Sequence, residues 1–470
     1  MWTPVRPRSV FLTAALAALD DGGDDVLFHH DVPMTYREAR EVLLRLHGGL
    51  GAADVVAVDL ANRPETVLVQ LAAMLRGARV LLVPASAPAA DQHAAAAAAG
   101  VTTVVTDRPA AWPHGDVRGV ADLDGEPVPL DPPAAVDVLF PTGGTTGVPK
   151  LIRHSGIYDG MAHIFTKSPE PERTLVVAPM THMTGHASVV GALLRGDSVV
   201  IRNGFDAGAV LADIERHRIT SLSLTPPRLA AVLDHPGRPG TRLDSVRSLS
   251  LGAAPLPPHR LAQALDVFGP VVGQGYGLTE APMIASISAG ELIGRPDRLG
   301  SVGRIVPGMA ARIVDGEVEV RGLAMMDGYL GAPPVGDGWL PTGDLGRFDD
   351  EGYLYLLDRA DEMVIVGEHG TKIAPATVEH ALIAHPAVRG AVVFGDGGSL
   401  HAVVVADGPL SADEVRAHAR ASFGREHYVP ARVDFADALP MTGAGKIDKR
   451  AVRAAFASQA GSTATPSGSA

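Results

Sequence analysis

The chain has 470 residues, of which 46% are hydrophobic and 20% are charged, and its formal net charge is −13 at pH 7. This length exceeds what one hydrophobic core usually organises, so at least two domains are expected, with enough chain for an enzyme. The acidic balance leaves no basic stripe for nucleic acid, and no apolar run approaches the length of a membrane span, so we expect neither nucleic acid nor membrane as a partner.

Cysteine is absent from the sequence. This excludes disulfides, thiolate zinc sites and a covalent cysteine intermediate. The apolar stretch Phe11–Leu19 is short and runs directly into Asp20, which is not typical of a signal peptide. We therefore expect a cytoplasmic protein. Residues 457–470 are small and polar, and they are predicted to form a disordered tail.

The first regular pattern alternates compact apolar runs with helical stretches. Its segments are Val55–Leu60, Pro64–Leu75, Val80–Val83, Asp91–Ala99 and Val101–Thr106. Strand and helix in turn predict βαβ units with a parallel sheet and right-handed crossovers.

A loop rich in glycine and threonine, Thr142 to Lys150, follows the next apolar run. Gly143, Gly144 and Gly147 allow several backbone N–H groups to approach one anion, because no side chain blocks the way. The hydroxyls of Thr142, Thr145 and Thr146 add donors, and Lys150 adds a compact cation. These features predict a polyphosphate site. The alternative is an ordinary turn after a strand, and the loop lacks the Gly-Lys-Ser/Thr ending of a P-loop.

After this loop the alternation of strands and helices continues, and it is followed by a region of short strands. A second wound sheet is predicted from the strands Thr174–Ala178, Ser198–Ile201, Ser221–Thr225 and Ser248–Gly252 and the helices Ala187–Leu194, Ala207–His217 and Arg228–Leu233. Short runs rich in Val and Ile between glycine turns (Ala311–Val314, Glu317–Val320, Tyr353–Leu356) predict a small β-subdomain. From Val364 a hairpin followed by helices and strands predicts a separate α+β unit.

The segment Thr-Gly-Gly-Thr-Thr-Gly-Val-Pro-Lys resembles the phosphate loop of the ANL adenylating superfamily, which contains acyl-CoA synthetases, adenylation domains and luciferases. Four further segments resemble this family in the expected order, and together they cover about Asp54 to Val452. The resemblance implies a large N-terminal domain of wound α/β sheets plus a β-subdomain, residues 1–360, followed by a small mobile α+β domain, residues 361–456. It also implies ATP, Mg²⁺ and, as co-substrate, CoA.

The resemblance assigns the nucleotide site to three segments. Gly275 to Glu280 is similar to the family segment in which the tyrosine lies beside adenine, the threonine contacts the α-phosphate and the glutamate holds Mg²⁺. Ser250 to Pro255 resembles the strand end on the other face of the base, and Asp344 and Arg359 match the ribose contacts. The residues implied in ATP or AMP binding are the loop residues above with Ala253, Ala254, Gln274, Gly275, Tyr276, Asp344 and Arg359, and the implied metal contacts are Glu280 and Thr146.

By the same resemblance, Lys446 in its glycine-rich loop is the catalytic lysine, acting with Glu280 and Thr279. Without that context a lysine between glycines is usually only solvated. Asp361 falls where the family places the hinge between its two domains. Electrostatics supports the assignment, since a carboxylate approaching the α-phosphorus of ATP meets several negative charges that a nearby cation offsets.

The acyl substrate site is expected to follow the segment Pro179 to His186, which resembles the family's gate segment with His182 as the gate. The resemblance places Thr184, Ser188, Gly252, Gly277 and Met283 along the acyl pocket. The gate segment has no aspartate, so an α-amino acid is disfavoured, and an aryl or short-to-medium acyl carboxylate is expected. His186 is unusual beside the gate, and a hydrogen-bonded wall residue and a catalytic base are both open.

The acceptor of the second step is less certain from the sequence. Val366 to Pro375 carries about two extra residues where CoA ligases have a tight turn. The alternatives are therefore a carrier protein, an amine, or nitrite activation as in diazotase-like relatives. A regulator that binds nucleotide without catalysis is a fourth possibility, which the presence of Glu280, Asp344, Arg359 and Lys446 opposes.

Overall fold

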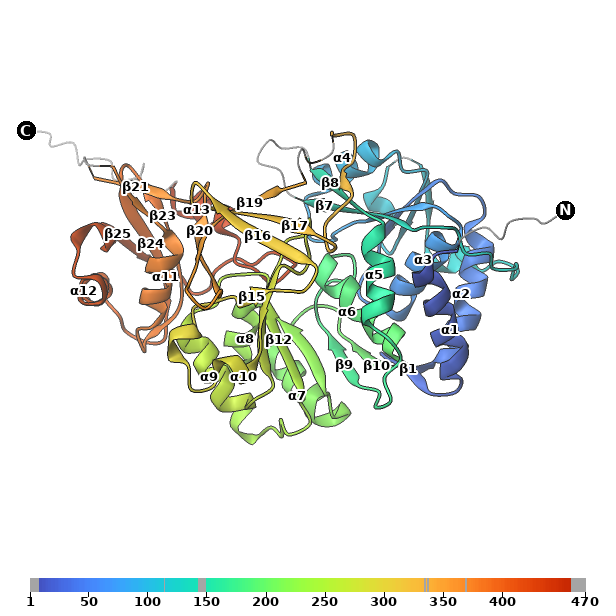
Figure 1. Cartoon of the computed structure of the whole chain (residues 1–470), viewed down its shortest axis with the longest axis horizontal. Helices are drawn as coiled ribbons and strands as arrows, with labels where there is room; N and C mark the ends of the chain where they lie inside the picture. Colours follow the sequence, from blue (N-terminus) through green and yellow to red (C-terminus); the bar gives the residue numbers. More distant parts are fainter. Residues whose placement is uncertain are drawn as a thin grey trace, which may run out of the picture.

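A computed structural model describes residues 8–113, 115–142, 149–333, 335, 338–367 and 370–457. Two large sheets flanked by helices form the N-terminal body, an antiparallel sheet lies beside them, and a smaller unit follows (Figure 1). That C-terminal unit, orange to red in Figure 1, lies at the opposite end of the molecule from the first helices, in blue. The predicted fold class, large wound α/β sheets followed by a smaller domain, is confirmed.

The first wound sheet has the strand order β18-β8-β7-β4-β3-β5-β6. Its strands are β3 (Val55–Asp59), β4 (Arg79–Leu82), β5 (Thr103–Thr106), β6 (Asp116–Arg118), β7 (Asp137–Thr142), β8 (Lys150–His154) and β18 (Gly328–Tyr329). The β3 strand pairs in parallel with β4 and β5, with Val58 opposite Leu82, and the helices α3 (Pro64–Leu75) and α4 (Ala89–Ala99) make the crossovers. The predicted βαβ pattern is therefore confirmed, although β5 begins two residues later than Val101.

The second wound sheet has the order β15-β14-β13-β12-β11-β9-β10-β1-β2. Its strands are β1 (Val26–His29), β2 (Met34–Thr35), β9 (Arg173–Val176), β10 (Ser198–Ile201), β11 (Ser221–Leu224), β12 (Ser248–Gly252), β13 (Val272–Tyr276), β14 (Ala285–Ile287) and β15 (Arg304–Ile305). The β9 strand ends at Val176 and not at Ala178. The β13 strand continues through Tyr276, because Gln274 to Tyr276 pair with β14.

Helices cover both large sheets. They include α1 (Val10–Gly22), α2 (Tyr36–Leu50), α5 (Gly156–Ile164), α6 (Met183–Arg195), α7 (Ala207–His217), α8 (Pro226–Leu233), α9 (Pro258–Phe268) and α10 (Ala289–Leu292), with short 3₁₀ turns η1 (Pro109–Ala111), η2 (Val120–Leu123), η3 (Arg238–Gly240), η4 (Pro296–Arg298) and, in the C-terminal unit, η5 (Glu426–Tyr428). The α8 helix begins at Pro226, earlier than the predicted Arg228. Proline is favourable in a first turn, where its missing N–H would have no partner.

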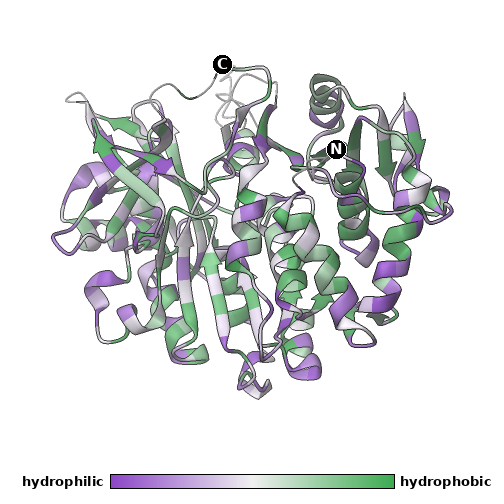
Figure 2. Cartoon of the chain, turned by 45° about the vertical axis from the view of Figure 1, so that its right-hand side comes forward, coloured by the Kyte–Doolittle hydropathy of each residue, from purple (hydrophilic) through white to green (hydrophobic). Residues whose placement is uncertain are grey.

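Apolar residues on the strands and the inner helix faces form the core. In Figure 2 green, apolar colour follows the central strands, while purple collects on the outer turns. Among the described helices, none is both long and apolar enough to cross a membrane.

The predicted β-subdomain is an antiparallel sheet in the order β16-β17-β19-β20. Its strands are β16 (Met309–Val314), β17 (Glu317–Gly322), β19 (Leu340–Phe348) and β20 (Leu354–Arg359). The register sets Asp344 of β19 directly opposite Arg359 of β20. Two polar residues far apart in the pattern thus become neighbours on one pair of strands.

The C-terminal unit has its own core, with Val378, Leu382, Val393 and Val404 fully or almost fully buried. Its elements are the hairpin β21 (Val364–Val366) and β22 (Thr371–Ile373), then α11 (Pro375–Ile383), β23 (Val388–Asp396), β24 (Ser399–Ala406), α12 (Ala412–Phe423), β25 (Arg432–Phe435) and α13 (Lys449–Ala457). The predicted change at Val364 to a hairpin with helices and strands is confirmed.

Ion pairs tie this unit to the segment that enters it. The Lys449 ammonium lies 2.7 Å from Glu362 and 3.2 Å from buried Glu379. The Asp358 carboxylate accepts a 2.8 Å hydrogen bond from the backbone N–H of Ala376, at the start of α11.

His186 anchors α6 in the core. Its Nδ1 lies 2.9 Å from Gln70 Oε1 and its Nε2 lies 2.9 Å from the Tyr158 hydroxyl. The Gln70 amide nitrogen donates to Met180 O, so Gln70 Oε1 accepts from His186 Nδ1–H, and the imidazole is neutral. His186 is thus a buried hydrogen-bonded residue between helices α3, α5 and α6.

We predict that His186→Leu lowers the melting temperature near neutral pH, because Tyr158 and Gln70 each lose a buried partner, at a cost of about 1–3 kcal/mol per group. Burial lowers the pKa of His186 to about 3. Since the unfolded imidazole has a pKa of about 6.5, the unfolded state takes up a proton first as pH falls, and the wild type loses stability between about pH 6.5 and about pH 3.

The variant lacks this proton uptake, so the gap in melting temperature between wild type and His186→Leu should narrow between about pH 7 and about pH 5. Differential scanning calorimetry across that range measures it. A gap that stays constant with pH would show that His186 titrates normally in the fold.

Candidate active site

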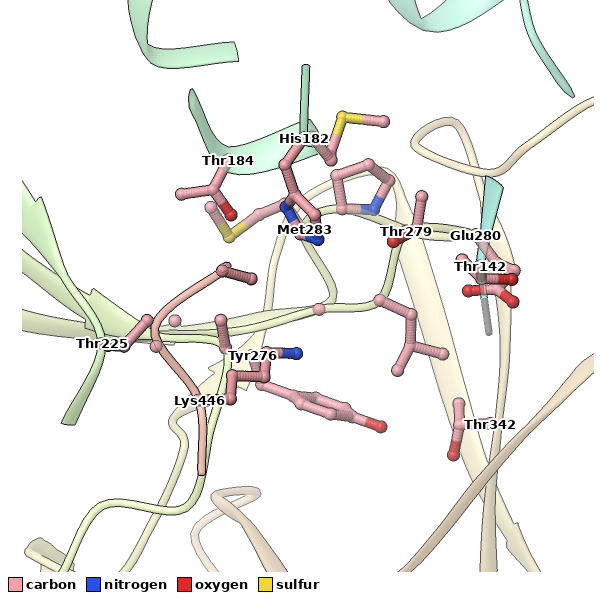
Figure 3. Close-up of a pocket in the computed structure, with 18 of the residues that line it drawn as sticks. Thr142, His182, Thr184, Thr225, Tyr276, Thr279, Glu280, Met283, Thr342 and Lys446 are labelled. Atoms are coloured by element: carbon pink, nitrogen blue, oxygen red, sulfur yellow. The ribbon is translucent and has the colours of Figure 1, made fainter. Parts of the chain in front are cut away.

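A cavity of about 750 Å³ lies where the N-terminal body, the antiparallel sheet and the C-terminal unit meet. Its walls include the carboxyl ends of β11, β12 and β13, part of β19, and the loop that carries Lys446 (Figure 3). Ligands in open α/β sheets bind at this edge, because the loops after parallel strands all open there.

Most of the predicted site residues that the structure describes line this cavity. They are Thr142, Lys150, His182, Thr184, Gly252, Ala253, Gly275, Tyr276, Gly277, Thr279, Glu280, Met283, Arg359, Asp361 and Lys446. The cavity wall does not include Ala254, Gln274, Asp344 or Ser188. Ser188 lies one turn into α6, and its hydroxyl donates to Thr184 O at 2.8 Å. Gly143, Gly144, Thr145, Thr146 and Gly147 lie outside the described residues, so their predicted phosphate contacts stay predictions.

Asp344 lies just behind the cavity wall and is held from two sides. Its carboxylate accepts from the Tyr276 hydroxyl at 2.6 Å and from the Arg359 guanidinium at 3.3 Å. Burial raises the pKa of Asp344, and the two hydrogen bonds and the charges of Arg359 and Lys446 oppose that rise. The carboxylate is therefore pre-positioned as an acceptor at one end of the cavity.

Thr279 and Glu280 lie on a loop that is held by groups outside it. His154 Nε2 lies 2.7 Å from Thr279 O, the Tyr329 hydroxyl donates to Glu280 Oε1 at 3.0 Å, and the N–H of Met326 donates to Glu280 O at 2.7 Å. Tyr329 also presents its ring to Lys150, whose ammonium lies 5.2 Å from the ring centroid. Tyr329 was not predicted, because a tyrosine in a two-residue edge strand has no recognisable signal in the sequence.

Lys446 extends from the C-terminal unit into the cavity (Figure 3). Its loop is closed by a bridge between Met441 and Ile447 and by a 2.7 Å hydrogen bond from Thr442 N to Lys446 O. Burial lowers the pKa of Lys446, Asp344 raises it, and Arg359 lowers it. The cation is thus drawn toward Asp344 across the boundary between the two units.

The opposite wall of the cavity is formed mainly by small, apolar or neutral groups. His182 is neutral there, since burial first, and then the charges of Lys446 and Arg228, lower its pKa to about 4. A side chain on Gly277 would meet Pro282 O at 2.2 Å, and one on Gly252 would meet Gly275 O at 2.6 Å, so these glycines let strands and loop approach closely. Ala253, between them in the wall, has a φ of 68°, which is unusual for a residue other than glycine.

Two further residues of the cavity wall, Thr225 and Arg228, were not predicted. Thr225 ends the predicted strand Ser221–Thr225, and Arg228 begins the predicted helix Arg228–Leu233. Both segments were assigned only a structural role. Their side chains reach the Lys446 loop, a contact between parts of the chain more than 200 residues apart that no local pattern contains.

The donor set at Glu280 fits a hard divalent cation only together with a ligand. Within the described ranges, no group of three or more His, Asp and Glu side chains is arranged to hold a metal. Mg²⁺ characteristically takes one or two carboxylates, several waters and the phosphate oxygens of a substrate. One carboxylate in the cavity that Thr142 and Lys150 also line matches this pattern.

Comparisons with known proteins agree with this geometry. Residues 17–330 match the family model described as AMP-binding enzyme, and residues 377–446 match the AMP-binding enzyme C-terminal domain. A medium/long-chain-fatty-acid–CoA ligase of Mycobacterium tuberculosis is 32% identical over 93% of this chain and 88% of its own length.

Two solved structures have the same fold over almost the whole chain. The amide bond synthetase of Marinactinospora thermotolerans superposes with a TM-score of 0.84 at 29% identity, covering 95% of this chain and 100% of that one. The o-succinylbenzoate CoA synthetase of Bacillus subtilis, in complex with its acyl-adenylate intermediate, superposes with a TM-score of 0.82 at 26% identity, covering 96% and 98%. The chain therefore belongs to the AMP-binding enzymes, the adenylate-forming ligases of the ANL superfamily that its motifs resemble.

Proposed function

We propose that the protein activates a carboxylic acid with ATP as an acyl adenylate, releases pyrophosphate, and transfers the acyl group to CoA. The observation that carries this proposal is the position of Lys446, which lies in one cavity with Thr279, Glu280 and Arg359 and close to Asp344. These residues offer binding partners for a nucleotide, and Lys446 offers a positive charge where the acid would attack it.

Lys446 offsets the repulsion between the two substrates. A carboxylate that approaches the α-phosphorus of ATP at 4 Å is repelled by about 4 kcal/mol for each pair of unit charges at an effective dielectric of 20. The ammonium stabilises the charge on the five-coordinate phosphorus more than it stabilises the separate reactants, which lowers the barrier. The substrate carboxylate is itself the nucleophile, so the reaction needs none from the protein.

Glu280 is the carboxylate that would hold Mg²⁺, with Thr146 as the second proposed contact. Mg²⁺ at this position would neutralise part of the phosphate charge. Tyr329 holds Glu280 through a 3.0 Å hydrogen bond, so the carboxylate keeps one orientation before the ion arrives.

The acid is best described as aryl or short-to-medium acyl. His182, Thr184, Gly252, Gly277 and Met283 offer small, apolar or neutral contacts, and the gate segment 179–186 has no aspartate for an ammonium group. Among the relatives, one is named for medium- and long-chain fatty acids and another for o-succinylbenzoate. The proposed acids share the medium chain length with the first and the aromatic ring with the second.

Amide formation is the second candidate for the acyl transfer step. It is favoured by the similarity to the amide bond synthetase and by the longer turn between Val366 and Pro375. A carrier-protein thiol would use the same adenylate, whereas nitrite would take the place of the carboxylate in the reaction with ATP. Mixing the preformed adenylate with CoA, small amines and a phosphopantetheinylated carrier protein, and identifying the product by mass spectrometry, distinguishes the acceptors, and pyrophosphate release from ATP with nitrite and no acid tests nitrite activation. An amide formed faster than a thioester would replace CoA as the proposed acceptor.

Asp361 is the proposed hinge between residues 1–360 and 361–456. It lies in a turn directly after β20, lines the cavity, and its carboxylate lies 3.5 Å from Arg359. Rotation at this position would withdraw Lys446 from the cavity and bring the β21–β22 hairpin toward it.

We predict that Lys446→Ala lowers the rate of acyl-adenylate formation by about 10²–10³, the usual loss when one group that stabilises transition-state charge is removed. Pyrophosphate release measures the rate, and calorimetric ATP binding should change little. Lys167→Ala, which removes an exposed lysine paired with Asp21, is the control and should retain the wild-type rate. A wild-type rate in Lys446→Ala would exclude Lys446 from the chemistry.

Glu280→Gln should raise the Mg²⁺ concentration needed for half-maximal adenylation, because the amide lacks the charge that holds a hard cation. Magnesium titrations at saturating ATP give the midpoint. Glu317→Gln removes another carboxylate from the same cavity and should leave the midpoint in place. Equal midpoints in Glu280→Gln and wild type would reduce Glu280 to a structural role.

Asp361→Pro should separate the two half-reactions. Proline holds φ near −65°, and within the described part of the chain the Asp361 N–H donates no backbone hydrogen bond, so the change restricts rotation without removing one. We expect adenylation to survive in part and acyl transfer to fall further, measured on one preparation with circular dichroism of the fold. Asp361→Ala, which removes the carboxylate but not the rotation, is the matched control, and equal losses in both steps for Asp361→Pro would count against the hinge.

A further inference from the structure

The Lys446 loop rests on two side chains of the N-terminal body. The Thr225 hydroxyl donates to Gly445 O at 2.6 Å, and the Arg228 guanidinium donates to Gly443 O at 3.3 Å. Both acceptors are backbone carbonyls that flank the lysine on its N-terminal side. The contact therefore depends on the path of the loop and leaves the lysine side chain untouched.

Thr225 precedes two prolines, and its hydroxyl contacts the Lys446 loop and makes no hydrogen bond to the helix that follows it. It occupies the N-cap position of α8, where a threonine hydroxyl usually accepts from the backbone N–H of the second or third helical residue. Pro226 and Pro227 have no N–H at the first two helical positions, and the Thr225 side chain makes no capping hydrogen bond. The hydroxyl, in a residue only 8% exposed, is directed to Gly445 instead.

Arg228 is a buried cation that depends on carbonyl groups. Only 7% of the residue is exposed, and burial lowers the pKa of its guanidinium, with no carboxylate among the described residues opposing that shift. Its recorded hydrogen bonds go to Val177 O and Gly443 O, and its guanidinium lies 5.3 Å from the centroid of the Phe205 ring. Gly443 O is thus part of what compensates a buried charge.

The fit between the loop and this surface leaves no space for side chains. A Cβ on Gly445, where φ is +79°, would lie 2.4 Å from Arg228 Nε, and a Cβ on Gly443 would lie 2.2 Å from Ser86 Oγ. The glycines beside Lys446 therefore allow close docking in this arrangement, in addition to any mobility they give the loop.

We propose that Thr225 and Arg228 form a seat for the catalytic loop, and that Thr225 is a positioning residue for adenylate formation but not for acyl transfer. The proposal rests on the role proposed above for Lys446. Neither seat residue is required to touch the reacting atoms. They hold Lys446 where it acts, and their contacts are lost when the C-terminal unit turns away, so transfer does not use them.

Thr225→Val tests the seat, because it keeps the shape of the side chain and removes the hydroxyl. We expect kcat for acyl-adenylate formation to fall about tenfold, with the KM for ATP little changed, since one hydrogen bond that positions Lys446 is lost. Transfer from a preformed adenylate should keep the wild-type rate. Thr225→Ser should restore adenylation because it restores the donor.

Hydrogen exchange of the peptide around residues 440–448, measured without substrates, gives a second readout that needs no activity. Exchange should be faster in Thr225→Val than in wild type. Thr220→Val is the matched control: Thr220 is equally buried at the other end of β11, and its hydroxyl contacts the backbone of Arg173. It should leave exchange and both half-reactions unchanged.

The outcomes separate this proposal from the proposed function. Thr225→Val could show faster exchange while the wild type forms no acyl adenylate from any acid tested. That result would support the seat and overturn the proposed function. Unchanged exchange, or equal losses of adenylation and transfer, would overturn the seat even if the enzyme proves to be a ligase.

Discussion

The site depends on the electrostatic attraction between the ammonium of Lys446 and a cavity that is built mainly by another part of the chain. Lys446 comes from the C-terminal unit, and the residues it faces, Asp344 and Arg359, come from the antiparallel sheet of the N-terminal body. Burial lowers the pKa of Lys446 while Asp344 raises it, so the position of the lysine is a balance between loss of water and a charge partner. The ammonium therefore enters the cavity at a cost in hydration that the charge of Asp344 partly offsets.

The rest of the cavity is held firmly by comparison. Thr279 and Glu280 are fixed by hydrogen bonds from His154 and Tyr329, and Asp344 is fixed by Tyr276 and Arg359. Each of these supports comes from a strand or a strand end. Because groups on strands are held in place before a substrate arrives, little reorganisation is left for the reaction itself. Among the described residues of the cavity wall, Ala444 and Lys446 are contributed by the C-terminal unit through one loop.

Glycine and proline shape the contact between the Lys446 loop and the N-terminal body. Pro226 and Pro227 begin α8 and leave its first two positions without an N–H. Gly445 and Gly443 let the loop backbone come close to Arg228 and Ser86. The same residue types that mark turns in the sequence therefore determine how two distant parts of the chain meet.

Local patterns in the sequence were enough to predict the wound sheets and the change at Val364, because periodicity reflects how neighbours along the chain fold. The segments that carry Lys446, Glu280 and Arg359 were marked by their resemblance to short motifs of a known family. The start of α8 at Pro226 and the end of β9 at Val176 were misjudged, because helix and strand ends depend on packing that the local pattern does not contain.

Only the tertiary structure placed Tyr329 beside Glu280, and Thr225 and Arg228 beside the Lys446 loop. It also showed that Ser188 lies outside the cavity wall, and that His186 is a core residue held by Gln70 and Tyr158. Ser188 donates to Thr184 O within its own helix, but the other relations are hydrogen bonds between segments far apart in the chain. The physical reason is that their partners are decided by how sheets and helices pack, which short-range spacing does not encode.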